Sequence, residues 1–103
     1  MLLANIDYIP DKKYKILGLV DASVVKAKGP GGDLLASLEA FAGGDVTEYA
    51  DMLTHARQQA VVKMMNVAET MGADAVINIR YTTCAVMQNA AEIIVYGTAV
   101  KFI

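Results

Sequence analysis

The stretch DVTEYADMLTHARQQAVVKMMNVAETMG, residues 45–72, decides the fold of this 103-residue chain. Its apolar residues recur every three or four positions, which is the spacing of one face of an α-helix. Asp45 and Glu48 have the spacing of a capping box at the amino-terminal end of a helix. Gly72 stands where a glycine commonly ends one. The stretch therefore predicts one long helix between Asp45 and Gly72.

The predicted helix carries a wide apolar arc, because a second apolar stripe lies beside the first and is interrupted by Arg57. A helix that rests on one sheet needs a single stripe. The second stripe therefore predicts a further contact, with another subunit. The main stripe comprises Tyr49, Leu53, Ala56, Ala60, Met64, Val67 and Met71, and the second comprises Val46, Ala50, Val61, Met65 and Ala68.

Segments rich in β-branched and aliphatic residues predict four strands around this helix, and a short helix is predicted before it. The last strand is apolar on both alternating sets of residues, and such a strand is covered on both faces. With helices on one side of the sheet only, the other cover has to come from another subunit. The predicted strands are Leu2–Ile6, Lys15–Val25, Ala75–Thr83 and Glu92–Ile103, with a turn at Pro10–Lys13 and the short helix at Asp33–Ala42.

The length and composition predict a single domain, residues 1–103, in the cytoplasm. Hydrophobic residues make up 55% of the chain, which also favours burial between subunits. The nine basic residues are scattered and the net charge is −2, so neither nucleic acid nor a membrane surface is a predicted partner. No apolar run reaches the roughly 18 residues of a membrane helix. One cysteine and a start without a basic signal region fit a cytoplasmic protein.

Several short motifs, taken in order, resemble the YbjQ-type family. They are Gly43-Gly44, Tyr49, Leu53–Arg57, Gly72–Val76 and Gly97–Val100, together with GLVDASVV at residues 18–25. The resemblance implies a dodecin-like, two-layer α/β (α+β) subunit: an antiparallel sheet with one long helix on one face and a short helix before it. It also implies a homo-oligomeric ring, a pentamer, and the family description "putative heavy-metal-binding", which names no reaction.

The stretch RYTTCAVMQN, residues 80–89, holds the single cysteine, Cys84, and also Met87, and both are soft metal ligands. If the strand continues to Cys84, three residues separate it from Met87, so the two side chains point apart. The chain has no CxxC or HxH motif, which favours a structural cysteine at a strand end or interface. A metal at Cys84 would need several copies in a ring. Cys84 would share its face with Asn78, Arg80 and Thr82, opposite to Ile77, Ile79 and Tyr81.

Two further side chains on the predicted helix invite a functional interpretation. His55 follows Asp51 by four residues on the polar side, which favours a solvated pair. Arg57 interrupts an apolar stripe, and a buried or interfacial guanidinium needs a partner. We favour an intersubunit salt bridge or carbonyl contact for Arg57 over anion binding in a cleft between subunits. Tyr49 and Arg80 join Arg57 as candidates for intersubunit or ligand contacts.

These observations favour a homo-oligomeric binding or scaffold domain that holds a metal or a small ligand between subunits. The alternative is an enzyme whose active site is shared by adjacent chains and uses Arg57, Arg80 and Tyr81. The sequence shows no nucleophile–base pair and no dense carboxylate cluster, so the alternative ranks second and no catalytic residue is predicted. The sequence names no cofactor and no metal.

Overall fold

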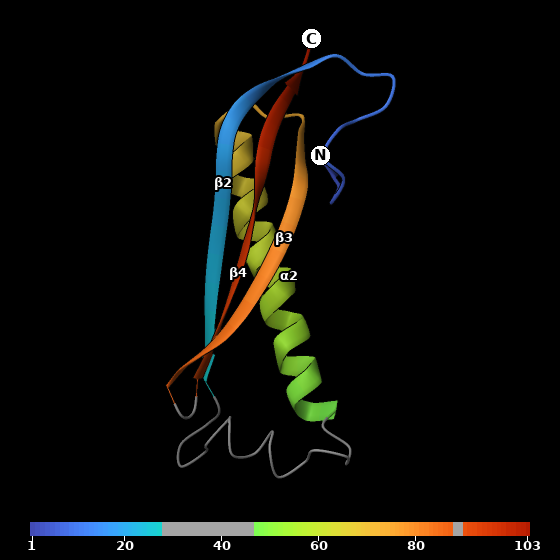
Figure 1. Cartoon of the computed structure of the whole chain (residues 1–103). Helices are drawn as coiled ribbons and strands as arrows, with labels where there is room; N and C mark the ends of the chain where they lie inside the picture. The colour runs from blue at the N-terminus through green and yellow to red at the C-terminus, as the bar shows by residue number, and fades with distance from the viewer. Residues whose placement is uncertain (28–46, 88–89) are drawn as a thin grey trace.

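The structure, a computed structural model, describes residues 1–27, 47–87 and 90–103 as a four-stranded sheet with a helix on one face. The sheet order is β1-β3-β4-β2, and the helix runs behind it in Figure 1. The predicted two-layer arrangement of sheet and long helix is therefore confirmed. The elements are β1 (Leu2–Leu3), β2 (Tyr14–Ala27), α2 (Thr47–Thr70), β3 (Ala75–Met87) and β4 (Ala90–Phe102).

Some predictions differ from these elements or fall outside them. The three long strands pair antiparallel as predicted, but β1 pairs with β3 in parallel, so the sheet is mixed. The predicted short helix at Asp33–Ala42 and the capping residue Asp45 lie outside the described residues. Within the described ranges, no helix is both long enough and apolar enough to cross a membrane.

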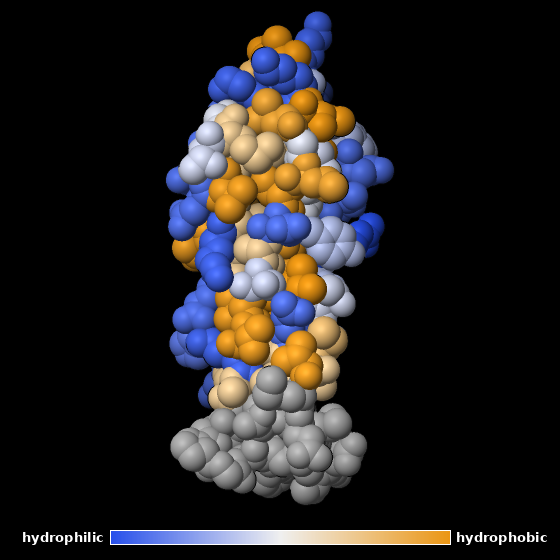
Figure 2. Space-filling model, turned by 90° about the vertical axis from the view of Figure 1, so that its left-hand side faces the viewer, coloured by the Kyte–Doolittle hydropathy of each residue, from blue (hydrophilic) through white to orange (hydrophobic). Residues whose placement is uncertain are grey.

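The two edges of the sheet are formed by β2 and by β3 with its short partner β1. The outer side of β2 has no strand partner among the described residues. The amino-terminal segment covers the β3 edge as far as Ile79, whose N–H donates to the Ala4 carbonyl at 3.1 Å. From Arg80 onward the β3 edge has no described strand partner either. Figure 2 views the molecule from the β2 side and shows hydrophobic residues along the middle of this face, with hydrophilic residues on both sides.

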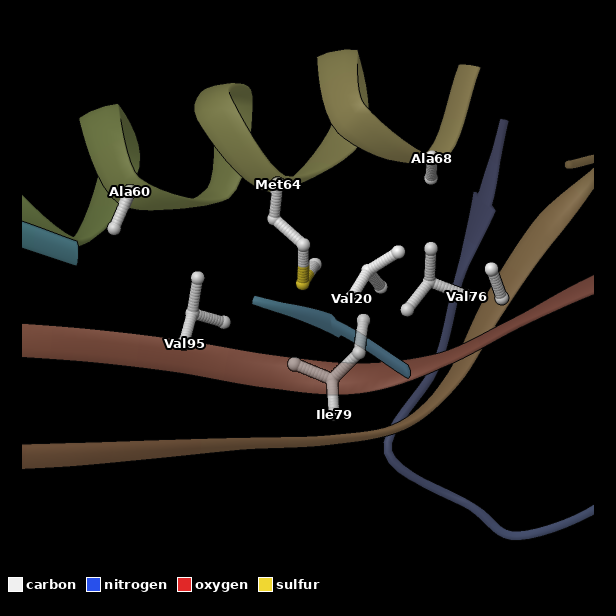
Figure 3. Close-up of a cluster of buried hydrophobic side chains, with 8 residues drawn as sticks. Val20, Ala60, Met64, Ala68, Val76, Ile79 and Val95 are labelled. Carbon is white, nitrogen blue, oxygen red and sulfur yellow. The ribbon is translucent and has the colours of Figure 1, made fainter. Parts of the chain in front are cut away.

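The main core lies between α2 and the sheet, and alanines let the helix approach closely. Met64 is fully buried and points toward Val20, Val95 and Ile79 (Figure 3). The predicted helix stripe is confirmed in its middle but is wrong at its end, where Val67 is 44% exposed. Buried residues spaced four apart shift gradually around the helix, because one turn has 3.6 residues. This shift keeps the buried residues against a sheet whose strands twist. The buried helix positions are Ala56, Ala60, Met64 and Ala68.

A β-bulge in β3 changes which side chains share a face. Asn78 has a φ of 54°, and Asn78 and Ile79 together lie opposite Gly97 of β4. The bulge places Ile77 on the second face of the sheet and Ile79 against the helix. The predicted common face for Ile77, Ile79 and Tyr81 is therefore wrong, because an extra residue shifts the alternation by one.

The second face of the sheet is covered at one end by the amino-terminal segment. This segment has to pass from the β3 edge to the β2 edge, because β1 and β2 lie at opposite sides of the sheet. Ile9, 9% exposed, packs there with Ile77, Ala75 and Val100. The predicted cover on both faces of β4 is thus supplied at this end by the chain itself. At the other end Tyr96 remains 41% exposed.

The carboxyl-terminal end of α2 follows the sequence closely. The Gly72 N–H donates to the Glu69 carbonyl at 3.0 Å, and the Ala73 N–H donates to the Ala68 carbonyl at 3.1 Å. This pair of bonds is a Schellman motif, and Gly72 has the positive φ, 81°, that the motif requires. The prediction that Gly72 ends the helix is confirmed.

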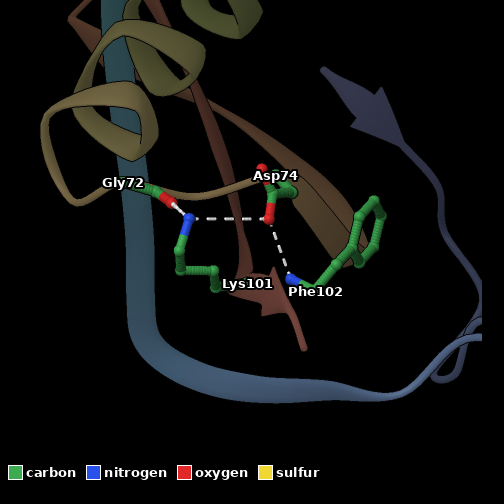
Figure 4. Close-up of polar contacts among 4 residues, drawn as sticks. All are labelled: Gly72, Asp74, Lys101 and Phe102. Carbon is green, nitrogen blue, oxygen red and sulfur yellow. Dashed lines mark hydrogen bonds and ion pairs between the residues drawn. The ribbon is translucent and has the colours of Figure 1, made fainter.

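Polar contacts then fix the end of β4 to the end of the helix (Figure 4). Lys101 Nζ donates to the Gly72 carbonyl at 3.3 Å and lies 3.7 Å from Asp74 Oδ2. The same carboxylate oxygen accepts the Phe102 backbone N–H at 2.8 Å. The lysine thus places its charge beside the free carbonyls of the helix end, where a cation is favoured.

Candidate ligand grooves on either side of the helix

A groove runs between α2 and β3 and consists of two adjoining hollows, of about 410 Å³ and about 380 Å³. Both hollows are lined by Val61 and Tyr81, so they adjoin at these two side chains, and we name the two together the α2/β3 groove. Its other lining residues are Leu3, Ala4, Asn5, Ile79 and Arg80 in the first hollow, and Thr54, Arg57, Gln58 and Val62 in the second.

A second groove lies on the other side of the helix, between α2 and β2, and has a volume of about 490 Å³. We name it the α2/β2 groove. It shares Gln58 and Val62 with the α2/β3 groove, so these two side chains form the ridge of the helix between the grooves. Its lining residues are Val24, His55, Gln58, Gln59, Val62 and Lys63.

Arg80 borders the first hollow, Arg57 lines the second, and Tyr81 lines both. An active site that combines these three residues from adjacent chains stays a prediction. Arg57 is exposed and donates to Thr54 Oγ1 at 3.3 Å, so the buried environment considered for it is not found within the chain. Arg80 donates to Asn78 Oδ1 at 3.4 Å. Tyr49 belongs to the first turn of α2, but its side chain lies outside the described residues.

His55 does not form the predicted pair with Asp51. Both residues are described and exposed, and no ion pair joins them. His55 instead lines the α2/β2 groove together with Lys63, whose Nζ donates to the Ser23 carbonyl at 3.1 Å. The sequence reasoning missed Lys63. Its position eight residues after His55 and four after Gln59 places the three on one side of a helix, which was the signal available.

Cys84 is exposed on the face of the sheet that points away from α2. β3 continues beyond the predicted end at Thr83, and Cys84 pairs in register with Glu92. Because side chains alternate along a strand, Cys84 shares its face with Arg80 and Thr82, as predicted. His55 lies on the helix, on the other side of the sheet, so no cysteine–histidine pair is formed.

Comparison with known proteins places the chain in a family. The profile described as "Putative heavy-metal-binding" (YbjQ_1) matches residues 1–103. The chain belongs to the YbjQ family. Similar proteins include a UPF0145 protein of Clostridium novyi, 47% identical over 103 residues that cover 100% of both chains. A UPF0145 protein of Thermotoga maritima is 45% identical over 102 residues, 98% of this chain and 96% of that one.

The fold is also found in a solved structure. A crystal structure of a protein of unknown function from Pediococcus pentosaceus, assigned to the DUF74 family, matches with a TM-score of 0.75. The match covers 100% of this chain and 98% of that chain at 16% sequence identity. At this identity the likeness concerns the mixed sheet-and-helix fold alone, so it assigns no ligand.

The YbjQ family description raises the question of a heavy-metal site, and the donors among the described residues of one chain do not fit it. A tight soft-metal site needs about three or four sulfur or nitrogen ligands. Within residues 1–27, 47–87 and 90–103, no group of three His, Cys, Asp or Glu side chains could hold a metal ion. The register gives only Cys84 and Glu92 as neighbouring donors.

Proposed function

We propose that the protein is a homo-oligomeric binding module that assembles through its strand edges and holds a small ligand between subunits. Family resemblance supports a ring of dodecin-like, two-layer subunits, with a pentamer as its size. The described residues contribute two features to this proposal: two sheet edges that lack a strand partner, and apolar residues exposed along one of them.

The free edges are the observation that carries the proposal. A strand edge presents unpaired backbone N–H and C=O groups, and natural proteins protect such edges or pair them with another chain. Here the outer side of β2, a strand of 14 residues, and the outer side of β3 from Arg80 onward lack a described strand partner, whereas β4 pairs with both on their inner sides. The two edges differ in sequence, so a contact from one to the other is head-to-tail and closes a ring when the rotation allows it.

Apolar side chains on β2 support the same contact. Ile16 is 70% exposed, Leu19 is 82% exposed and Val25 is 56% exposed, although all three are large hydrophobic residues. Figure 2, viewed from the β2 side, shows hydrophobic residues gathered along the middle of this face. A contiguous apolar band on a small protein is typical of a protein–protein contact. We therefore propose β2 as one half of the subunit interface.

The substitution Leu19→Lys tests this interface, with Leu19→Met as the matched control. Light scattering at low micromolar concentration is expected to give a multiple of 11.0 kDa for the parent and for Leu19→Met. Leu19→Lys places a charge in the contact, so we expect a smaller mass with an unchanged circular dichroism spectrum. A folded parent of 11.0 kDa, or an unchanged mass for Leu19→Lys, would contradict the proposed assembly.

A further inference from the structure

We propose that the ligand is a small organic anion, a carboxylate or phosphate ester with an apolar body, and that two chains share its site. Arg57 comes from the α2/β3 groove of one copy, and Lys63 and His55 come from the α2/β2 groove of the next copy. The inference rests on the proposed assembly and names the ligand class and the residues of its site.

The first argument is the distribution of cations. The chain has a net charge of −2 and nine basic residues, of which two are arginines. Arg57 lines the α2/β3 groove from the helix, whereas Arg80 borders its first hollow at the β3 edge, with a side chain on the face that points away from α2. Arginine binds carboxylate and phosphate through two parallel hydrogen bonds, which lysine cannot do. The groove thus presents Arg57, one of the two side chains of this protein that are best suited to an oxyanion.

The second argument is the lack of competing carboxylates. No described residue that lines either groove is an aspartate or a glutamate. Arg57 and Arg80 contact neutral oxygens, of Thr54 and Asn78, and the ion pair among the described residues is formed by Lys101 and Asp74. Among the described residues, no carboxylate therefore competes with a ligand for the positive charge in either groove.

The third argument is the space that edge-to-edge assembly leaves between helices. Each copy contributes three long strands to the extended sheet, so equivalent helices lie about 14 Å apart at the usual strand spacing of about 4.8 Å. Helices in direct contact are about 8–10 Å apart. A channel several ångströms wide consequently remains between successive α2 helices. It joins the α2/β3 groove of one copy to the α2/β2 groove of the next.

The walls of this channel define the rest of the ligand. Val61 and Tyr81 form the middle of the α2/β3 groove, and Val24 and Val62 line the α2/β2 groove. These side chains suit a ligand with an apolar or aromatic body, whereas the cationic side chains lie at the margins of the channel. Inorganic phosphate alone would leave the apolar walls unused, so an anion that carries a hydrocarbon group is expected to bind more tightly.

The test uses phenyl phosphate as probe, with benzyl alcohol as the neutral control, and measures binding by titration calorimetry on the assembled protein. We expect the parent to bind phenyl phosphate at least about tenfold more tightly than benzyl alcohol. Arg57→Gln and Lys63→Gln are each expected to weaken phenyl phosphate about tenfold or more, since each removes a charge-assisted contact. Lys13→Gln removes the same charge from the amino-terminal segment, outside both grooves, and is expected to leave binding unchanged.

Mixing the two variants decides whether the site is shared. When equal amounts of the two variants exchange subunits at random, about one contact in four joins a copy with intact Arg57 to a copy with intact Lys63. A head-to-tail ring therefore recovers about one quarter of the parent's sites. No recovery would place both residues in a single-chain site and overturn the shared site. Equal binding of the two probes would overturn the anion site. Light scattering on the same samples shows whether the subunits are assembled. A failure of the ligand site can therefore be distinguished from a failure of the assembly.

Discussion

The two faces of the sheet are covered in different ways. One face is covered by α2 along its length, and its core of alanines, valines and Met64 is buried. The other face is covered by the amino-terminal segment at the Val100 end, where Ile9 packs. Toward Ile94 and Cys84 no other described segment packs on this face, and Tyr96, Thr82 and Cys84 are exposed. The chain thus completes one face alone and leaves part of the other open.

The covered parts of the sheet stabilise a single chain, whereas the open part of the second face remains for contact with a neighbouring subunit. Substitutions under the helix remove buried contacts and are expected to lower the free energy of unfolding strongly. Those under the amino-terminal segment should have a smaller effect, and those on the open part should have almost none. Because assembly adds stability that depends on concentration, all variants are compared at one protein concentration.

The largest effect is expected for Met64→Ala. Met64 is fully buried among Val20, Val95 and Ile79, and the truncation leaves a cavity that the surrounding strands cannot close. Such changes cost about 3 kcal/mol. Urea denaturation followed by circular dichroism measures the loss. Val62→Ala, at a position 55% exposed on the same helix, serves as control and is expected to cost less than about 0.5 kcal/mol.

Gly97→Ala tests the bulge that sets the two faces apart. A Cβ on Gly97 would lie 2.8 Å from Val76 Cγ1 and 3.0 Å from the Ile77 carbonyl oxygen. The backbone atom cannot move aside easily, so we expect a loss of about 2 kcal/mol. At Gly72 a Cβ would meet nothing within 4 Å, and Gly72→Ala is expected to cost about 1 kcal/mol through its positive φ alone. A smaller loss at Gly97 than at Gly72 would refute the close approach.

Ile9→Ala tests the amino-terminal cover of the second face. Ile9 packs with Ile77 and Val100 on a segment that only partly encloses it, so we expect a loss of about 1.5 kcal/mol, at the low end for a buried isoleucine. Ile6→Ala, at a position 47% exposed in the same segment, is the control and should be close to neutral. Equal, negligible losses for both variants would mean that the segment does not stabilise this face.

Cys84→Ala is expected to have the smallest effect, because the side chain is exposed on the open part of the second face. Unfolding and assembled mass should be unchanged. Elemental analysis of the purified parent should find no tightly held zinc or copper, since Cys84 and Glu92 are too few donors. A metal held at less than one ion per chain, and lost in Cys84→Ala, would instead indicate a site formed by several copies around the ring axis.

Apolar periodicity and a capping glycine in the sequence predicted the long helix and its carboxyl-terminal end. The helix core at Ala60 and Met64 follows the 3.6-residue period, and Gly72 shows where the helix ends. The bulge at Asn78 could not be predicted, because one positive φ leaves no trace in an apolar pattern, and it reversed the faces of Ile77 and Ile79. The cover by Ile9 was missed since it depends on the path of the amino-terminal segment across the sheet.

For the candidate site, the sequence marked Arg57 because it interrupts an apolar stripe. It could not show that Arg80 and Tyr81 line the same groove, because that depends on how β3 lies beside α2. Lys63 looked like an ordinary solvated lysine. Its place beside His55 becomes visible only when β2 is seen to close the other side of the helix.

Amide hydrogen exchange along β2 of the native protein tests the central claim most directly. In one chain, alternate N–H groups of Tyr14–Ala27 bond to β4, and the others point outward. If copies assemble through strand edges, both sets are protected at high concentration, and the outward set loses protection on dilution or in Leu19→Lys. Outward amides that exchange as fast as those of an open edge, while those bonded to β4 stay protected, would contradict the account.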